Sequence, residues 1–252
     1  MKIGVIGGSG LYELPGLSDA KKITVDTPFG PVNLLRGLKG DREVFFLSRH
    51  KKGHKVPPHM INYRANIYAL FKLGVNYVIS TNAVGSVREY IEPGYLVIPD
   101  QIIDLTKNRV YTFFDGDFEV KFPDGRKKSG VIHTDVSEPY CNLLRSKIKD
   151  AADNLGLKYV YGGTYVCMEG PRFETPAEIK FIQVIGGDIV GMTSSPEVFL
   201  AKELELCYAS ISVVTNLAAG MQKKITHKEV IELFNKMLVK LVELISHVID
   251  ML

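Results

Sequence analysis

An arginine and a histidine stand side by side where a predicted strand ends. Arg49 and His50 follow the apolar run 44–47, and Lys51 and Lys52 come next. A guanidinium offers a planar fork of donors for phosphate or carboxylate oxygens, and a histidine adds a donor that can carry charge near neutral pH. We interpret the two lysines as a solvated basic loop. The Arg-His pair predicts an anion site.

A glycine-rich segment, GGSG at positions 7–10, follows the first apolar run of the chain. Its backbone N–H groups and the Ser9 hydroxyl can converge on an anion. The segment also begins a dinucleotide-binding fingerprint, but Glu13 replaces the third glycine and Pro15 stands where the helix should run. A plain glycine turn explains the segment equally well, so it does not decide between these alternatives by itself.

Small polar residues follow three more predicted strands, in segments 80–86 (STNAVGS), 191–195 (GMTSS) and 215–216 (TN). Ligands of open α/β sheets gather at the carboxyl ends of strands, and hydroxyls with free N–H groups at a helix N-terminus suit an anion. Taken singly, each segment is equally compatible with a tight turn or a cap. Together they indicate several polar donors at one edge of a sheet.

An aromatic residue lies beside acidic residues in segment 167–174 (CMEGPRFE). Phe173 can stack on a flat heterocycle while a carboxylate such as Glu174 accepts an N–H from it. The alternative is a structural ion pair between Glu169 and Arg172. With the anion donors, this segment predicts a polar and aromatic site that is large enough for a base.

The elements that must position these residues are short apolar, β-branched runs alternating with helical patterns. Several runs are continuously apolar, as strands buried on both faces are. The alternation indicates an α/β fold with a largely parallel or mixed sheet, in a single domain over residues 1–252. We expect strands at 2–6, 32–35, 44–47, 77–80, 95–98, 158–165, 188–190 and 208–214, and helices at 62–71, at 139–154 and after Thr175, Ser195 and Thr226.

Local signals refine this picture. Segment 175–178 (TPAE) has a hydroxyl cap, a proline at the first helical position and a carboxylate at the third, which together form a capping box. Segment 195–197 (SPE) is predicted to open a helix in a similar way. Segment 106–129 is rich in charge, glycine and aromatics, so we expect a long loop there that is either functional or mobile.

Composition excludes several classes of protein. The chain has 252 residues, 46% hydrophobic and 23% charged, which is ordinary for a globular domain. A net charge of +3 is too balanced to favour nucleic acid as the main partner. Three scattered cysteines suggest a reducing compartment rather than a disulfide framework. No apolar run approaches the ~20 residues that span a bilayer, so we expect a cytoplasmic protein without a membrane partner.

The order of the motifs resembles that of the purine nucleoside phosphorylase and 5′-methylthioadenosine phosphorylase family. The shared motifs are GGSG, SRH, NYRANI, TNAVGS, CMEGPRFETPAE, GMT with SPEV and LAKE, and SVVTN, and they extend from residue 3 to about residue 235. The resemblance implies a mixed central sheet flanked by helices, and a homotrimer or hexamer with active sites near subunit interfaces. It implies inorganic phosphate as a co-substrate, with neither a metal nor an organic cofactor.

The resemblance also assigns roles to single residues. Met192 and Phe173 are expected to pack against ribose and base, and His133 resembles the residue that a neighbouring subunit contributes near the 5′ end. The residues expected to bind phosphate are Ser9, Arg49, His50, Ala83 and Thr193, and those expected to take part in catalysis are Asn216, Glu174 and His50.

The implied reaction has a clear physical course. Breaking the bond at the anomeric carbon leaves an oxocarbenium-like sugar and an electron-rich purine. Phosphate held beneath the sugar stabilises that cation and captures it. The translational and rotational entropy of phosphate is lost when it binds, rather than in the reaction step. On the other side, Asn216 is expected to donate to purine N7 or O6 and stabilise the leaving base.

The purine can be predicted from three residues. Glu174 can accept the N1–H of hypoxanthine or guanine but repels the N1 lone pair of adenine. Asn216 matches the 6-oxopurine branch of the family less decisively, because an amide can turn either way. His227 resembles the histidine that meets a 5′-hydroxyl, although a surface histidine in a first helical turn is the alternative. SRH and CMEGPRF, in contrast, resemble the methylthioadenosine branch.

We therefore predict a 6-oxopurine nucleoside phosphorylase of purine salvage that acts on inosine and guanosine. Methylthioinosine is the close alternative substrate, and methylthioadenosine is a weaker one. A hydrolytic nucleosidase would leave the phosphate-binding set unexplained, and a non-catalytic nucleotide-binding module would bind without turnover. Base release from inosine, with and without phosphate, separates these classes.

Overall fold

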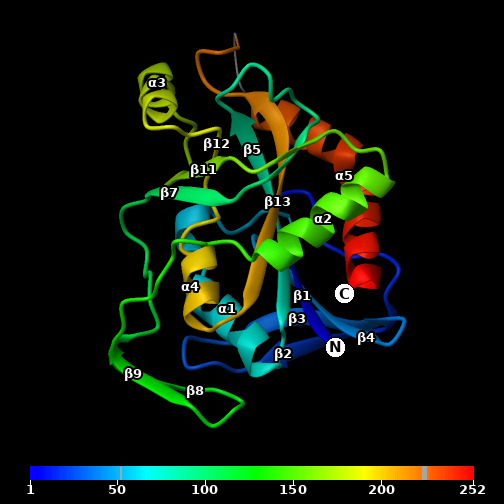
Figure 1. The fold of residues 1–252 in the computed structure, drawn as a ribbon, viewed down its shortest axis with the longest axis vertical. Coiled ribbons are helices and arrows are strands. Elements are labelled where there is room, and N and C mark those ends of the chain that lie inside the picture. Colours follow the sequence, from blue (N-terminus) through cyan, green and yellow to red (C-terminus); the bar gives the residue numbers. More distant parts are fainter. Residues whose placement is uncertain (52, 223–225) are drawn as a thin grey trace.

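A large mixed sheet forms the centre of the molecule (Figure 1). The computed structural model describes residues 1–51, 53–222 and 226–252, without the side chains of 227–229. The main path of the sheet has the order β10-β6-β13-β5-β1-β4-β3-β2, and β11 joins it through β12 and also pairs with β7. Its strands are β1 (Lys2–Gly7), β2 (Ser18–Val25), β3 (Val32–Lys39), β4 (Arg42–Ser48), β5 (Tyr77–Ser86), β6 (Leu96–Ile98), β7 (Gln101–Leu105), β10 (Tyr159–Tyr161), β11 (Thr164–Met168), β12 (Ile189–Gly191) and β13 (Cys207–Leu217).

The central strands β4, β1, β5 and β13 run parallel to one another. Their carboxyl ends therefore reach the same edge of the sheet, which is where polar segments of an α/β protein can meet. The pairs β3/β4, β2/β3, β6/β13 and β5/β12 are antiparallel. The expected mixed α/β sheet is confirmed.

Helices cover both faces of the sheet, α1 and α4 on one side of β13 and α2 and α5 on the other (Figure 1). Their apolar faces form two large buried clusters, which include Ile67 and Leu200 on the first side and Ile148 and Ile245 on the second. The helices in the described residues are α1 (Tyr63–Lys72), α2 (Asn142–Asn154), α3 (Pro176–Val184), α4 (Glu197–Glu203) and α5 (His227–Met251), with a short 3-10 helix at Pro58–Met60.

The two predicted helix caps differ in outcome. At α3 the capping box is present, because Thr175 accepts from the Glu178 N–H and Glu178 accepts from the Thr175 N–H. At α4 the predicted hydroxyl cap is wrong. Ser195 donates to Asp104 at 2.5 Å instead, and the residue before the helix is Pro196.

Some strands escaped prediction. The edge strand β2 is mostly exposed and carries charged side chains, which protect an edge but give no apolar run to detect. The single strand expected at 158–165 is two strands, β10 and β11, because Gly162 and Gly163 both adopt positive φ between them. Segment 106–129 is not one long loop as expected, because it contains β8 (Asp115–Lys121) and the start of β9 (Lys127–Val131), which pair as a hairpin (Figure 1). The Phe118 ring of β8 packs against Tyr68 of α1.

The expectation of no disulfide is wrong. Cys141 and Cys207 are joined by a disulfide across 66 residues of sequence. They meet because Cys141, just before α2, donates its N–H to Tyr208 O at the start of β13. That neighbourhood is a product of the fold and cannot be seen in cysteine spacing. Cys167 is a buried free thiol, and burial raises its pKa to about 12.

No helix in the described ranges is long and apolar enough to cross a membrane.

Candidate active site

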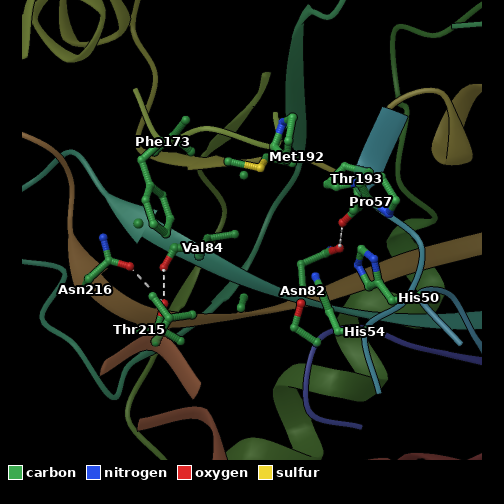
Figure 2. A pocket seen from close by; sticks show the side chains of 18 of the residues that line it. His50, His54, Pro57, Asn82, Val84, Phe173, Met192, Thr193, Thr215 and Asn216 are labelled. Carbon is green, nitrogen blue, oxygen red and sulfur yellow. Dashed lines mark hydrogen bonds between the residues drawn. The ribbon is translucent and has the colours of Figure 1, made fainter. Parts of the chain in front are cut away.

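A cavity of about 350 Å³ opens where the carboxyl ends of the central strands meet. Figure 2 shows Phe173 and Asn216 on one side of it and His50 and His54 on the other. The lining residues come from β5, β12, β13 and α5 and from the segments that follow β1, β4, β11 and β12: Ser9, Arg49, His50, His54, Pro57, Pro58, Asn82, Ala83, Val84, Gly85, Pro171, Phe173, Glu174, Val190, Gly191, Met192, Thr193, Thr215, Asn216 and Val230.

All of the predicted site residues whose side chains are described line this cavity, with the exception of His133. His133 is exposed and lies outside it, in the segment after β9. The side chain of His227 lies outside the described residues. Four of the predicted nucleoside-binding residues and the predicted phosphate-binding residues thus lie in one place, although they are spread over more than two hundred residues of sequence.

The guanidinium of Arg49 is fully buried and fixed by Glu197. Its Nε and Nη2 donate to the two carboxylate oxygens of Glu197 at 2.8 and 2.7 Å. Nη2 also donates to Ser80 Oγ at 2.6 Å, and Nη1 donates to Thr81 O at 2.9 Å. Among the described residues, four of its five N–H groups are therefore committed, which leaves one N–H of Nη1. The fork that the sequence suggested for a ligand is used by Glu197.

Glu197 is itself held by two further donors. Tyr208 donates to its Oε1 at 2.8 Å, and Ser80 donates to the same oxygen at 3.0 Å. A buried charge is tolerated only when it is paired and hydrogen-bonded. Burial opposes the charge of Arg49, but the attraction of Glu197 outweighs it, so the pKa of Arg49 is raised.

His50 is neutral, contrary to the expectation of a donor charged near neutral pH. Burial and the neighbouring Arg49 lower its pKa to about 3. Its Nδ1 lies 2.8 Å from Val56 O, and because a carbonyl only accepts, Nδ1 carries the proton. Nε2 is then an acceptor. The His54 ring stacks on His50 with the centroids 4.2 Å apart.

The glycine-rich segment serves packing as well as the site. Gly8 donates its N–H to Thr81 Oγ1 at 2.9 Å, so this N–H is not directed at a ligand. A Cβ at Gly8 would lie 2.3 Å from Thr81 O, so only glycine permits this close approach of β1 to β5. Ser9 follows and lines the cavity.

Asn82 joins two elements beneath the cavity. Thr193 donates its hydroxyl to Asn82 Oδ1 at 2.7 Å, and Asn82 Nδ2 donates to Ser210 Oγ at 2.5 Å. The loop after β12 is thereby tied to β5 and β13. Figure 2 shows Thr193 and Asn82 facing each other across this bond.

A β-bulge aims Thr215 and Asn216 into the same cavity. The pairing of β13 with β5 shifts between Val214 and Asn216, so that Thr215 is an extra residue. Successive side chains of a regular strand point to opposite faces, whereas a bulge can re-aim one of them. Asn216 Oδ1 accepts from the Thr215 hydroxyl at 3.0 Å, and Asn216 Nδ2 donates to Leu217 O at 3.0 Å.

Phe173 and Glu174 enter from the loop between β11 and α3. Phe173 is 37% exposed, and Glu174 is only 9% exposed. Burial raises the pKa of the Glu174 carboxyl. The alternative ion pair of Glu169 with Arg172 is wrong, because Arg172 donates to both carboxylate oxygens of Glu178.

Most lining residues that were not predicted lie in segments that the sequence had singled out. Asn82 and Thr215 are polar members of segments 80–86 and 215–216, and His54 lies two residues after Lys52; their polar types are the signal that could have identified them. Val230 lies in the apolar stripe of α5, where nothing in the sequence distinguishes it from core residues. Within the described residues, no group of three or more His, Cys, Asp or Glu side chains is arranged to hold a metal ion.

The cavity therefore has two chemically different ends. One end has small donors and a neutral histidine around a buried Arg-Glu pair, and the other has an aromatic ring, a carboxyl group and an amide. The sequence profile of the phosphorylase superfamily matches residues 2–250. The chain belongs to this superfamily.

Other members of the phosphorylase superfamily are similar over nearly the whole chain. A Pyrococcus furiosus protein named 6-oxopurine nucleoside phosphorylase is 52% identical over 100% of this chain and 93% of its own length. A Methanopyrus kandleri protein named probable S-methyl-5'-thioinosine phosphorylase is 47% identical over 99% of this chain and 92% of its own. The solved structure of methylthioadenosine phosphorylase from Schistosoma mansoni with adenine superposes with a TM-score of 0.91 at 34% identity, covering 99% of this chain and 91% of that one.

Proposed function

We propose that this chain cleaves 6-oxopurine ribonucleosides, inosine and guanosine, with inorganic phosphate to give the free base and ribose 1-phosphate. The observation that carries the proposal is the position of Glu174 beside Phe173, with Asn216 lining the same cavity as the anion donors. A carboxylate accepts the N1–H of hypoxanthine or guanine and repels the N1 lone pair of adenine. The similar proteins named 6-oxopurine nucleoside phosphorylase support this choice of base.

Phosphate is assigned to the end of the cavity with Ser9, Arg49, His50, Ala83 and Thr193. An oxygen of phosphate forms the new bond to the anomeric carbon while the bond from that carbon to the purine nitrogen breaks. The electron pair of the broken bond moves into the purine, which takes up the proton that hydrogen phosphate loses and leaves as the neutral base. Holding both reactants in one cavity removes the entropic barrier of their encounter.

His50 has a defined part in this arrangement. Because its Nδ1 donates to Val56 O, its Nε2 can accept a hydrogen bond from the P–OH group of hydrogen phosphate. Arg49 supplies its remaining N–H, and the adjacent hydroxyls supply further donors. The Arg49–Glu197 pair is already neutral, so phosphate is held by directed hydrogen bonds more than by net charge.

Asn216 stabilises the leaving base. One N–H of its Nδ2 is used by Leu217 O, and the other is available to purine N7 or O6. A donor that is already fixed before the charge develops stabilises the transition state without reorganisation. Phe173 packs on the base and Met192 on the ribose.

The assembly and location stay predictions. We propose a homotrimer or hexamer in which His133 reaches a neighbouring cavity, and its exposure outside its own cavity supports this role. No metal or organic cofactor is proposed, and phosphate is the co-substrate. A cytoplasmic location is retained, but the Cys141–Cys207 disulfide removes the cysteine argument for it.

A methylthio nucleoside is the alternative substrate. Pro57, Pro58 and Val230 add apolar surface to the cavity, which suits a methylthio group better than a hydroxyl. The Methanopyrus kandleri relative, with its thioinosine name, points the same way. This alternative keeps the 6-oxopurine and changes only the 5′ group.

Base release from inosine, guanosine, methylthioinosine and methylthioadenosine, each with and without phosphate, tests the proposal. We expect inosine and guanosine to lead and phosphate to be required. If methylthioinosine is cleaved fastest, the substrate carries the alternative 5′-methylthio group. A lead by methylthioadenosine would overturn the role of Glu174, and release without phosphate would overturn phosphorolysis.

A further inference from the structure

Arg109 is a buried cation in an otherwise exposed stretch. It lies between β7 and β8, and its neighbours Asn108 and Val110 are exposed, whereas Arg109 itself is 7% exposed. It does not line the active-site cavity. An arginine is rarely buried unless its donors are used, so its partners indicate its purpose.

Those partners are the backbone of two cavity loops. Nη1 donates to Met192 O at 2.8 Å and to Ser195 O at 2.6 Å. Nη2 donates to Glu169 O at 2.7 Å and to Met168 O at 3.3 Å. One guanidinium thus joins the loop that leads to Phe173 and Glu174 with the loop that carries Met192.

Arg109 also contacts a third wall of the cavity, at Pro58, through the hydroxyl of Tyr63. Arg109 Nη1 lies 3.3 Å from the Tyr63 hydroxyl, which in turn donates to Pro58 O at 3.0 Å. Pro58 lines the cavity. Burial raises the pKa of Tyr63 well above its ordinary value, so the phenol keeps the proton that it donates.

The stretch that carries Arg109 is anchored in return. Glu169 accepts the Lys107 N–H at 2.7 Å and lies 3.5 Å from Arg109 Nε. Further along, Glu203 accepts the Phe113 N–H at 2.8 Å. The position of the guanidinium is therefore fixed from both sides.

We propose that Arg109 is a positioning residue that sets the base and ribose side of the active site. It aligns the loops of Phe173, Glu174 and Met192 by donating to their backbone carbonyls, without touching substrate. The planar guanidinium can reach several carbonyls at once, and a lysine ammonium cannot match that geometry. This role of Arg109 rests on the proposed function only because the effect of changing Arg109 is measured as turnover of the nucleoside.

The phosphate side has anchors of its own besides the contacts of Arg109 with Met192 O and Ser195 O. Arg49 and His50 follow β4, and Arg49 is held by Glu197. Thr193 follows Met192 directly, but its hydroxyl is held by Asn82 of β5. A disturbed Arg109 should therefore affect the nucleoside more than phosphate.

Arg109→Lys is compared with Arg126→Lys, the same change on an exposed arginine of the β8–β9 hairpin. We expect kcat/KM for the nucleoside to fall about 10- to 100-fold in R109K, as for a small misplacement of a reacting group. The KM for phosphate should change less than about 3-fold, and R126K should match the wild type. Equal losses for both substrates, or none, would overturn the proposal.

Arg109→Ala with added guanidinium is the second test. Millimolar guanidinium should restore nucleoside turnover to R109A but not to R109K, whose ammonium fills the space, and it should leave the turnover of a matched Arg126→Ala unchanged. Lack of restoration in a folded R109A would contradict the positioning role. Calorimetric measurement of hypoxanthine binding separates the two proposals. If the wild type does not bind hypoxanthine, the proposed base is refuted. If the wild type and R109K bind it equally well, only the role of Arg109 is refuted. If another nucleoside leads the substrate assay, the comparison is made with that nucleoside and its base.

Discussion

Glu174 is an acid that burial makes harder to ionise, in a cavity where the proposed base requires the ionised form. Its pKa is raised by desolvation, and Arg172, two residues earlier, is occupied by Glu178. A purine N1–H donated to the carboxylate would favour ionisation. Binding of the base and ionisation of Glu174 should therefore be coupled.

Glu174→Gln tests this coupling. We expect kcat/KM for inosine to fall about 10- to 150-fold, because a hydrogen bond to a charged group contributes about 1.5–3 kcal/mol. The KM for phosphate should stay near the wild-type value. Glu178→Gln is the matched control, since glutamine also completes a capping box. Undiminished activity of E174Q on inosine would remove Glu174 from the base site.

The pH dependence follows from the same shift. As the pH falls through the raised pKa of Glu174, the carboxylate is lost and the KM for inosine should rise, whereas E174Q should lack this rise. The stability effect has the opposite direction. A raised folded-state pKa means stability is greatest below the unfolded value of about 4.5 and declines as the pH rises through the folded pKa. Urea unfolding at several pH values should show that the free energy of unfolding of E174Q rises relative to that of the wild type as the pH rises.

At this scale the sequence predicted which residue types line the cavity but not their state. Arg49 and His50 are where they were expected. Their behaviour depends on Glu197, 148 residues away from Arg49, and on the carbonyl of Val56. Charge state and hydrogen-bond commitment arise from such tertiary neighbours, which a single sequence does not pair.

At the scale of elements, the bulge in β13 is the feature that completes the site. The Thr215 hydroxyl lies 3.2 Å from Val84 O of β5 and 3.0 Å from Asn216 Oδ1, and its one hydrogen is shared between these acceptors. Asn216 Oδ1 is thereby held by Thr215, and the N–H of Nδ2 that Leu217 O does not use is left for the proposed base. Figure 2 shows both contacts of the Thr215 hydroxyl.

Thr215→Val should loosen that amide. We expect kcat for inosine to fall about 3- to 10-fold with a smaller change in KM, since a neutral hydrogen bond contributes about 0.5–1.5 kcal/mol. The matched control is Thr24→Val, which removes an exposed Thr–Asn hydrogen bond between β2 and β3. If kcat is unchanged in T215V, Asn216 does not depend on Thr215 for its orientation. Steady-state kinetics on both variants provide the comparison.

Elements with a strong local signal were predicted well. The apolar runs gave β1, β4, β5 and β13, and the capping box gave the start of α3. The bulge, the edge strand β2 and the break between β10 and β11 were missed. Each depends on pairing or backbone geometry, and the local sequence contains little of either.

For the whole molecule, the Cys141–Cys207 disulfide is a constraint far from the reaction. It joins the segment before α2 to the first residue of β13, whereas Thr215 and Asn216 lie toward the opposite end of that strand. Closing 66 residues of chain restricts the unfolded state by about 4 kcal/mol in the chain-entropy treatment. Stability and catalysis should respond to it separately.

Reduction should therefore lower the melting temperature of the wild type without changing KM for either substrate. The double variant Cys141→Ser with Cys207→Ser should melt lower than wild type and should not respond to reductant. Calorimetry with and without reductant, beside kinetics below the transition, measures both effects. A wild type that melts identically under both conditions would show that the bridge contributes no stability.

The buried pair of Arg49 and Glu197 has a consequence for the order in which the substrates bind. A cavity with an unpaired cation would attract anions from solution, and an anion would have to bind before the second substrate. Here that cation is balanced by the protein itself. We therefore expect that either substrate can bind first.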